Sequence, residues 1–131
     1  MKSEIVIGID SSTTATKTIA WDFNGKNIAG TSSPVRLVSP QPNYYEQDAE
    51  EWWQSLTESL RKLTHQVDKD RITGIAISNQ RETFVALDGK GNPVRPAITW
   101  LDERCKNQVD KFASIIGEDR IHQITGKPKD Y

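Results

Sequence analysis

Residues 5–17 read IVIGIDSSTTATK: a short apolar segment, a carboxylate, four consecutive hydroxyl side chains and, after two more residues, a lysine. Residues 5–9 are apolar, continuous and rich in β-branched side chains, which is typical of a buried strand. Asp10 ends this strand, and residues 11–14 form a polar turn. Carboxylate and hydroxyl groups are therefore expected at the carboxyl end of a buried strand.

Two further strands are predicted directly after this turn. Residues 17–22 alternate between polar and apolar side chains, and the Asn24-Gly25 pair is a strong hairpin signal. Residues 27–32 return as a third strand. The chain thus begins with a three-stranded meander.

A helix is expected after the proline-containing segment 34–42. Asp48 is a good N-cap residue, and Glu51 stands three positions later, which is the spacing of a capping box. Apolar side chains follow at spacings of three or four residues, at Trp52, Leu56, Leu60, Leu63 and Val67. This stripe predicts a helix of about five turns, with Trp52 and the adjacent Trp53 in the core.

The second half of the chain adds strands and one more helix. The expected elements are a buried strand at 72–77, strands at 83–87 and 97–100, a turn at 88–92, and a helix from Asp102 or Glu103 to Ile116. Gly117 is expected to stop that helix. This order predicts a mixed α/β layered fold.

Composition excludes several classes of protein. The 131 residues fit one ordinary domain. The chain has 17 basic and 18 acidic side chains, so there is no excess of positive charge for binding a nucleic-acid backbone. No apolar stretch approaches the ~20 residues of a membrane span, and no signal peptide is visible, so we expect a soluble, cytoplasmic protein. The single cysteine, Cys105, excludes an internal disulfide framework, and we interpret it, together with His65 and His122, as structural.

The hydroxyl-rich turn is the first candidate site. Asp10 can hold Mg²⁺ directly or through water, because Mg²⁺ takes one or two carboxylates and keeps several waters. Backbone N–H groups and the hydroxyls of Thr13 and Thr14 can bind phosphate oxygens, and Lys17 can neutralise their charge. The sequence contains no Walker A motif. The alternative is a plain hairpin with a polar turn.

The second candidate is the SNQRET segment at residues 78–83, which leaves a predicted strand at its carboxyl end. Ligands of open α/β sheets bind at this edge. Arg81 can donate to one sugar oxygen and Glu82 can accept from another. The alternative is a surface ion pair of little consequence.

The third candidate is the segment from Trp100 to Arg104. The face of Trp100 can cover the apolar side of a sugar, while Asp102 and Arg104 order the loop around it. The alternative is a core tryptophan followed by a helix N-cap.

Taken in this order, the three segments resemble the start of the FGGY carbohydrate kinases, which belong to the actin-like ATPase superfamily. The resemblance runs from Ile5 to Tyr131 and implies a ribonuclease H-like mixed sheet with flanking helices. It also implies ATP and Mg²⁺ as cofactors, with Asp10 at the Mg²⁺–phosphate site, Thr14 facing the transferred phosphate and Lys17 beside it. Ser12 departs from the family, which usually has glycine there, a residue that allows more backbone conformations.

The substrate segments resemble two branches of the family. The ISNQRET run is similar to glycerol kinases, which implies that Arg81 and Glu82 bind polyol hydroxyls. Trp100 matches the position at which the family places a residue that lines the wall of the substrate pocket. Tyr131 corresponds to a polyol contact of glycerol kinases, a tyrosine that follows a Thr-Gly dipeptide, and here it follows Thr125-Gly126 at a spacing one residue shorter. The W-x-D-x-R pattern at 100–104 instead resembles pentulose kinases, which places Asp102 in the substrate set.

The resemblance implies ATP-dependent phosphorylation of a sugar or polyol hydroxyl. Residues 125–131 form an unfinished loop, so we expect residues 1–131 to be the truncated N-terminal part of the first kinase lobe. The catalytic base, an Asp, and the adenosine pocket are then expected downstream, and the isolated chain should have no kinase turnover. Exposed apolar surface could drive association, including homo-oligomers.

Two other classes stay open. A ribonuclease H-like nuclease would need several carboxylates converging on two metals, and only Asp10 is evident. A non-catalytic nucleotide- or partner-binding domain of the actin-like superfamily would bind without depending on Arg81 or Glu82.

Overall fold

The computed structural model describes residues 4–130. Its main sheet has four strands in the order β3-β2-β1-β5, and a second, two-stranded sheet pairs β4 with β6. In chain order the elements are β1 (Ile5–Ser11), β2 (Ala15–Asp22), β3 (Asn27–Pro34), β4 (Glu46–Gln47), α1 (Ala49–Thr64), a 3₁₀ turn (Lys69–Arg71), β5 (Ile72–Asn79), β6 (Ala97–Ile98), α2 (Lys106–Ile116) and α3 (Glu118–Thr125). The mixed sheet with flanking helices confirms the predicted fold class.

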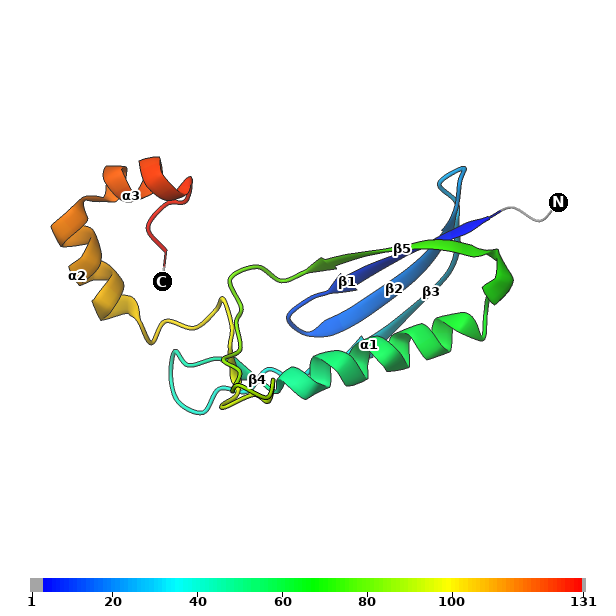
Figure 1. Cartoon of the computed structure of the whole chain (residues 1–131), viewed down its shortest axis with the longest axis horizontal. Helices are drawn as coiled ribbons and strands as arrows, with labels where there is room; N and C mark the ends of the chain where they lie inside the picture. The colour runs from blue at the N-terminus through cyan, green and yellow to red at the C-terminus, as the bar shows by residue number, and fades with distance from the viewer. Residues whose placement is uncertain (1–3, 131) are drawn as a thin grey trace.

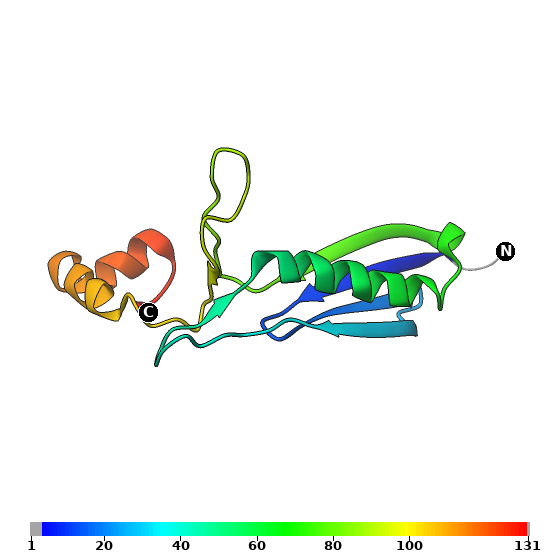
Figure 2. The same ribbon diagram turned by 90° about the horizontal axis from the view of Figure 1, so that it is seen from below.

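The meander forms as predicted, and β5 returns parallel to β1. β1 and β2 are antiparallel with Asp10 opposite Lys17, while β1 and β5 are parallel with Asp10 beside Ser78. A parallel return needs a crossover, which α1 supplies on one face of the sheet (Figure 2). The carboxyl ends of β1 and β5 consequently lie at the same edge.

The core lies between the sheet and α1. Alternate side chains of β1 point towards the helix, and its buried residues are Ile5, Ile7 and Ile9, with Ala20 of β2 and Leu63 of α1 beside them. Leu56, Leu60 and Val67 of the predicted stripe pack against this cluster. The stripe was therefore correctly predicted from Leu56 to Leu63, whereas α1 ends at Thr64 and Val67 packs against the core from the segment after the helix.

Hydroxyl groups complete the interface between α1 and the sheet. Thr18 Oγ1 lies 2.9 Å from Ser59 Oγ and 2.8 Å from Thr31 Oγ1, and Thr31 donates to the Ser59 carbonyl at 2.7 Å. Ser55 donates to the Ser33 carbonyl at 2.8 Å. Burying these hydroxyls is tolerable because each has a partner.

The start of α1 differs from the prediction. Asp48 caps the helix, accepting from the Glu50 N–H at 2.9 Å, but Glu51 forms no capping box. Its carboxylate instead binds the guanidinium and the backbone N–H of Arg36. Trp53 is 61% exposed and was wrongly predicted as core, because it falls on the outer face of the helix.

β5 is the predicted strand, but it is not buried. It is an edge strand of the described sheet, and Ile75 and Ile77 are 58% and 64% exposed. Residues 83–87 were predicted as a strand, yet only single bridges form there, between Phe84 and Ile98 and between Leu87 and Pro93. The turn at 88–92 is present, with Asp88 accepting the Lys90 and Asn92 N–H groups.

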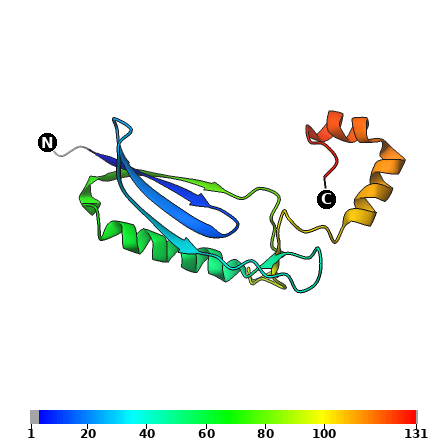
Figure 3. The same cartoon turned by 180° about the vertical axis from the view of Figure 1, so that it is seen from behind.

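The end of the described chain forms a helical arm beyond β4, away from α1 (Figures 1 and 3). α2 begins at Lys106 rather than at Asp102 or Glu103, and Gly117, with φ +89°, ends it as predicted. The sequence analysis did not anticipate α3, which starts directly after that glycine. Within residues 4–130, no helix is both long and apolar enough to cross a membrane.

These burial patterns predict that shortening two side chains has different effects on the free energy of unfolding. Leu63→Ala should lower the free energy of unfolding by about 2–5 kcal/mol, because it opens a cavity in the core. Trp53→Ala should change it by no more than about 0.5 kcal/mol, as for an exposed side chain. Urea denaturation checks both values, and equal costs would contradict the assignment of the buried helix face.

Candidate functional site

The hydroxyl-rich turn (residues 11–14) connects β1 to β2 and is closed by a hydrogen bond from the Ser12 N–H to the Ala15 carbonyl at 3.0 Å. Asp10 and Lys17 flank it on the sheet face opposite α1, and both are exposed. Asp10 Oδ2 accepts from the Ser12 hydroxyl at 2.6 Å. The turn therefore presents oxygen donors and one cation to solvent at the end of the sheet.

The buried amide of Gln47 fixes this turn from behind. Its Nε2 donates to the Thr13 carbonyl at 2.6 Å and to the Arg36 carbonyl at 3.4 Å. Its Oε1 accepts from Trp52 Nε1 at 3.2 Å and from Gln80 Nε2 at 2.8 Å. One side chain thus connects the hydroxyl-rich turn, α1 and the segment after β5.

Trp100 contacts the same turn through its side chain. Its indole N–H donates to Thr13 Oγ1 at 2.9 Å, across 87 residues of sequence. Its backbone N–H donates to Thr83 Oγ1 at 3.1 Å, and about half of the residue remains exposed. The ring is therefore held at the turn with surface left for a ligand.

A cavity of about 350 Å³ opens between these groups. It is lined by Asp10, Ser12, Thr13, Asn79, Gln80, Arg81, Glu82 and Trp100. The shared edge of the parallel strands explains this meeting, because Asp10 lies at the carboxyl end of β1 and Arg81 follows the carboxyl end of β5. Residues from all three predicted segments line one site.

A second cavity of about 830 Å³ adjoins the first, and both are lined by Arg81, Glu82 and Trp100. It extends to α2, α3 and residues 126–130. Asp102 belongs to this second lining, whereas Thr14 and Lys17 line neither cavity. The predicted substrate residue Tyr131 lies outside the described residues.

Residues 5–130 match the sequence profile of the FGGY family of carbohydrate kinases, N-terminal domain. The chain belongs to this family. It is 34% identical over 120 residues to xylulose kinase from Staphylococcus xylosus and 40% identical over 123 residues to glycerol kinase from Aquifex aeolicus, covering 92% and 93% of this chain. In both comparisons the chain spans 25% of the length of the relative.

Solved structures agree with the family. The chain aligns with gluconate kinase from Lactobacillus acidophilus at a TM-score of 0.90 and 28% identity, covering 98% of this chain and 26% of the other. It aligns with Plasmodium falciparum glycerol kinase with ADP at 0.83 and 28% identity, with the same two coverages. The actin-like fold and the FGGY resemblance are both confirmed.

The donor set around Asp10 suits a hydrated magnesium ion rather than a protein-caged metal. Within residues 4–130, no three His, Cys, Asp or Glu side chains cluster as a metal site. Asp10 is a single carboxylate beside hydroxyl groups, and Mg²⁺ bound through one carboxylate, water and phosphate needs no more. The donor set therefore fits the ion that the family implies.

Asp102 is engaged entirely within the chain. Its Oδ1 accepts from the Arg104 N–H and Nε at 2.9 and 2.7 Å, and its Oδ2 from the Tyr45 N–H and Arg104 Nη2, both at 2.7 Å. Burial opposes ionisation of this carboxyl, but the guanidinium and the two backbone N–H groups outweigh it and hold its pKa below the ordinary 3.8. Asp102 thus organises the loop behind Trp100.

Arg104 connects this loop to β4. Its guanidinium also donates to Glu46 at 2.8 Å and stacks over the Tyr44 ring, 4.2 Å from the centroid. The hydrogen bonds that Arg104 donates to Asp102, and a further one that it donates to Glu46, raise the pKa of Arg104 against an opposing effect of burial. Sequence reasoning missed Glu46 and Gln47, because no local pattern distinguishes them from other polar residues before a helix.

The Asp102 contacts predict a pH-dependent cost for Asp102→Asn. A folded-state pKa below the unfolded value gives stability that is present above about pH 3.9 and is lost as pH falls through the folded pKa. At pH 7 the variant should lose about 1–3 kcal/mol of unfolding free energy, because an amide nitrogen cannot accept these bonds. Urea denaturation from pH 7 down to pH 2 should show this difference shrinking.

Asp119→Asn, an exposed change in the first turn of α3, is the matched control and should cost no more than about 0.5 kcal/mol, the interaction of one exposed carboxylate with a helix N-terminus. A cost for Asp102→Asn that persists unchanged at pH 2 would contradict the role of the ionised carboxylate.

Proposed function

We propose that this chain is the N-terminal part of the first lobe of a kinase that uses ATP to phosphorylate a hydroxyl group of a sugar or polyol. The observation that carries the proposal is the 2.9 Å hydrogen bond from Trp100 to Thr13. It joins the side chain suited to cover a sugar to the turn suited to hold phosphate. A substrate against Trp100 would lie beside the phosphate groups, as phosphoryl transfer requires.

The substrate contacts follow from the cavity lining. Arg81 would donate to one hydroxyl and Glu82 would accept from a neighbouring one, so that a pair of hydroxyls is oriented rather than merely attracted. Trp100 would cover the apolar face of the carbon chain. Tyr131 is proposed as a further polyol contact, and Asp102 as a substrate residue chiefly through the loop that it holds.

The phosphate contacts lie at the other end of the smaller cavity. ATP supplies the phosphoryl group, and Mg²⁺ neutralises its charge. Asp10 would hold the ion through water, Thr13 and Thr14 would donate to phosphate oxygens, and Lys17 would approach from β2. Lys17 and Thr14 lie outside the cavity lining, so their contact requires phosphate to extend over the hydroxyl-rich turn.

The remaining machinery is expected elsewhere. The relatives are about four times as long as this chain, and we propose that the catalytic base and the adenosine pocket come from residues beyond it. The chain alone should then have no turnover. We place the enzyme in the cytoplasm, where ATP and small sugars meet, and expect the exposed isoleucines of β5 to drive association when nothing covers them.

The proposal predicts that Arg81→Ala impairs the full-length enzyme. With glycerol, xylulose or gluconate as acceptor, kcat/KM for the preferred substrate should fall by about 10- to 150-fold, the value of a hydrogen bond to a charged group. Coupled detection of ADP measures this. Arg120→Ala, an exposed change on α3, is the matched control and should leave kcat/KM unchanged.

Two results would contradict the proposal. Nucleotide binding without phosphorylation of any sugar or polyol would favour the non-catalytic binding domain. Full activity in Arg81→Ala would remove the assigned substrate site.

A further inference from the structure

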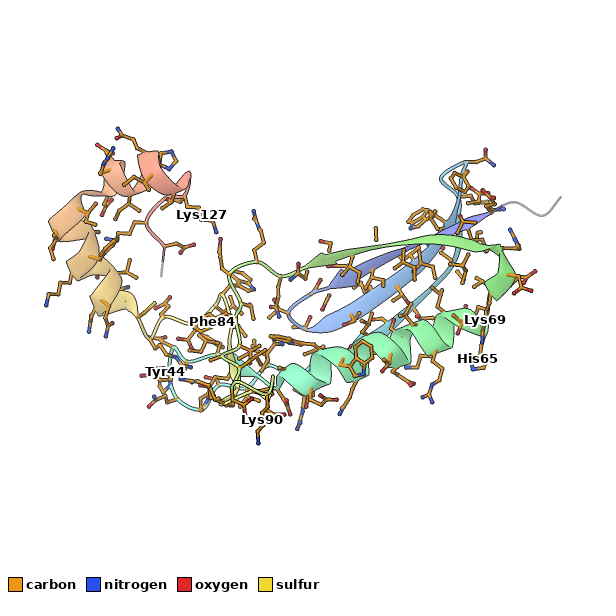
Figure 4. All side chains as sticks on the ribbon, viewed as in Figure 1. Tyr44, His65, Lys69, Phe84, Lys90 and Lys127 are labelled. Carbon is orange, nitrogen blue, oxygen red and sulfur yellow. The ribbon has the colours of Figure 1, made fainter. Side chains whose placement is uncertain are left out.

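Lys127 stands out because it pairs with a proposed substrate residue from a distant part of the chain. It follows α3, where Gly126 adopts a left-handed conformation with φ +72° and turns the chain back. Figure 4 shows the Lys127 side chain extending from the helical arm towards the segment after β5. There its ammonium group forms an ion pair with Glu82 Oε1.

This ion pair matters for the site more than for stability. Both side chains are about half exposed, and such pairs contribute little to folding. Within the site, the Lys127 hydrogen bond and charge, and then the Arg81 charge, lower the pKa of Glu82 against an opposing effect of burial. Glu82 also has φ +64°, a conformation that non-glycine residues rarely adopt and that surrounding contacts must maintain.

Lys127 lies at the end of the site that is farther from the hydroxyl-rich turn, in the larger cavity. Arg81, Glu82 and Trp100 line both cavities, whereas Lys127 lines only the larger one. Asp10 and Thr13 line only the smaller one. A substrate held by Arg81 and Glu82 can therefore reach the hydroxyl-rich turn with one end and Lys127 with the other.

Lys127 has donors available for such a substrate. An ammonium group carries three N–H donors. Among residues 4–130, Glu82 is the one hydrogen-bond acceptor found for Lys127 Nζ. Apart from Arg81, which is assigned to the substrate hydroxyls, the other cations of the larger cavity have acidic partners: Arg104 binds Asp102 and Glu46, and Lys129 binds Asp110 and Glu118.

We propose that Lys127 is a specificity-determining residue of the substrate site, donating to an acceptor oxygen that lies beyond the hydroxyls held by Arg81 and Glu82. This inference rests on the proposed function and narrows its substrate class. It selects a sugar chain of five or six carbons, ending in a hydroxyl or a carboxylate, over a three-carbon polyol. A shorter polyol that fills the Arg81–Glu82 pair leaves Lys127 without a ligand.

The test compares dissociation constants of the full-length enzyme for glycerol, xylulose and gluconate by titration calorimetry. Lys127→Met should weaken binding of xylulose or gluconate by about tenfold, which corresponds to about 1.4 kcal/mol. It should change glycerol binding by less than about threefold, about the measured range of an exposed ion pair. Preferential loss of gluconate binding identifies a carboxylate as the substrate group that contacts Lys127, and loss of xylulose binding identifies a hydroxyl.

Two further variants separate this role from a structural one. Lys127→Arg keeps a donor and a charge and should retain most of the affinity for the longer substrate. Lys111→Met removes one positive charge from the exposed surface of α2 and should leave all affinities unchanged. In Lys127→Met the pKa of Glu82, followed by carboxyl-carbon NMR, should rise towards its ordinary value.

The outcomes are distinguishable. Unchanged binding of xylulose and gluconate in Lys127→Met, an equal loss for glycerol, or a wild-type enzyme that binds glycerol alone would each overturn the role of Lys127. A wild-type enzyme that binds none of the three would overturn the proposed function and this inference with it.

Discussion

The buried side-chain amide of Gln47 is the interaction on which the site depends. It donates to the Thr13 carbonyl and accepts from Trp52 and Gln80, so one side chain connects the hydroxyl-rich turn, α1 and the segment after β5. A buried amide with donors and acceptors satisfied in this way costs little to bury and fixes direction as well as distance. The hydroxyl-rich turn is consequently a preorganised surface rather than a free loop.

The main sheet and the small β4-β6 pair each position a different part of the site. Parallel pairing of β1 with β5 brings Asp10 to the same edge as Arg81 and Glu82. The β4-β6 pair positions the loop that carries Trp100, and the Asp102–Arg104–Glu46 contacts hold that loop from behind. Trp100 then closes the arrangement by binding Thr13. The hydroxyl-rich turn and the loop that carries Trp100 thus become two walls of one cavity.

Much of this arrangement could be predicted from the sequence, because it depends on local signals. The meander, the N-cap at Asp48, the core position of Leu63 and the stop at Gly117 all follow from strand, turn and capping patterns. The sequence analysis assigned Asp10, Thr13, Thr14, Lys17, Arg81, Glu82 and Trp100 to one site. The described cavity brings five of them together, whereas Thr14 and Lys17 lie outside its lining. The family assignment is confirmed by the comparisons.

What could not be predicted depends on contacts between distant residues. Glu51 has the spacing of a capping box, but Arg36, fifteen residues earlier, takes its carboxylate. The apolar run at 72–77 predicts burial, yet nothing among the described residues covers Ile75 and Ile77. Gln47 and Lys127 act through partners 33 and 45 residues away, which no local pattern encodes.

The central claim, that the sugar and phosphate surfaces form one site at Trp100, is tested most directly by the indole N–H resonance of Trp100. In a ¹⁵N–¹H NMR spectrum of the full-length enzyme, adding its sugar or polyol should shift this resonance, since the ligand would cover a ring already bonded to Thr13. The indole resonance of Trp53, exposed on α1, should not move. A ligand that binds while the Trp100 resonance stays unchanged would contradict the account.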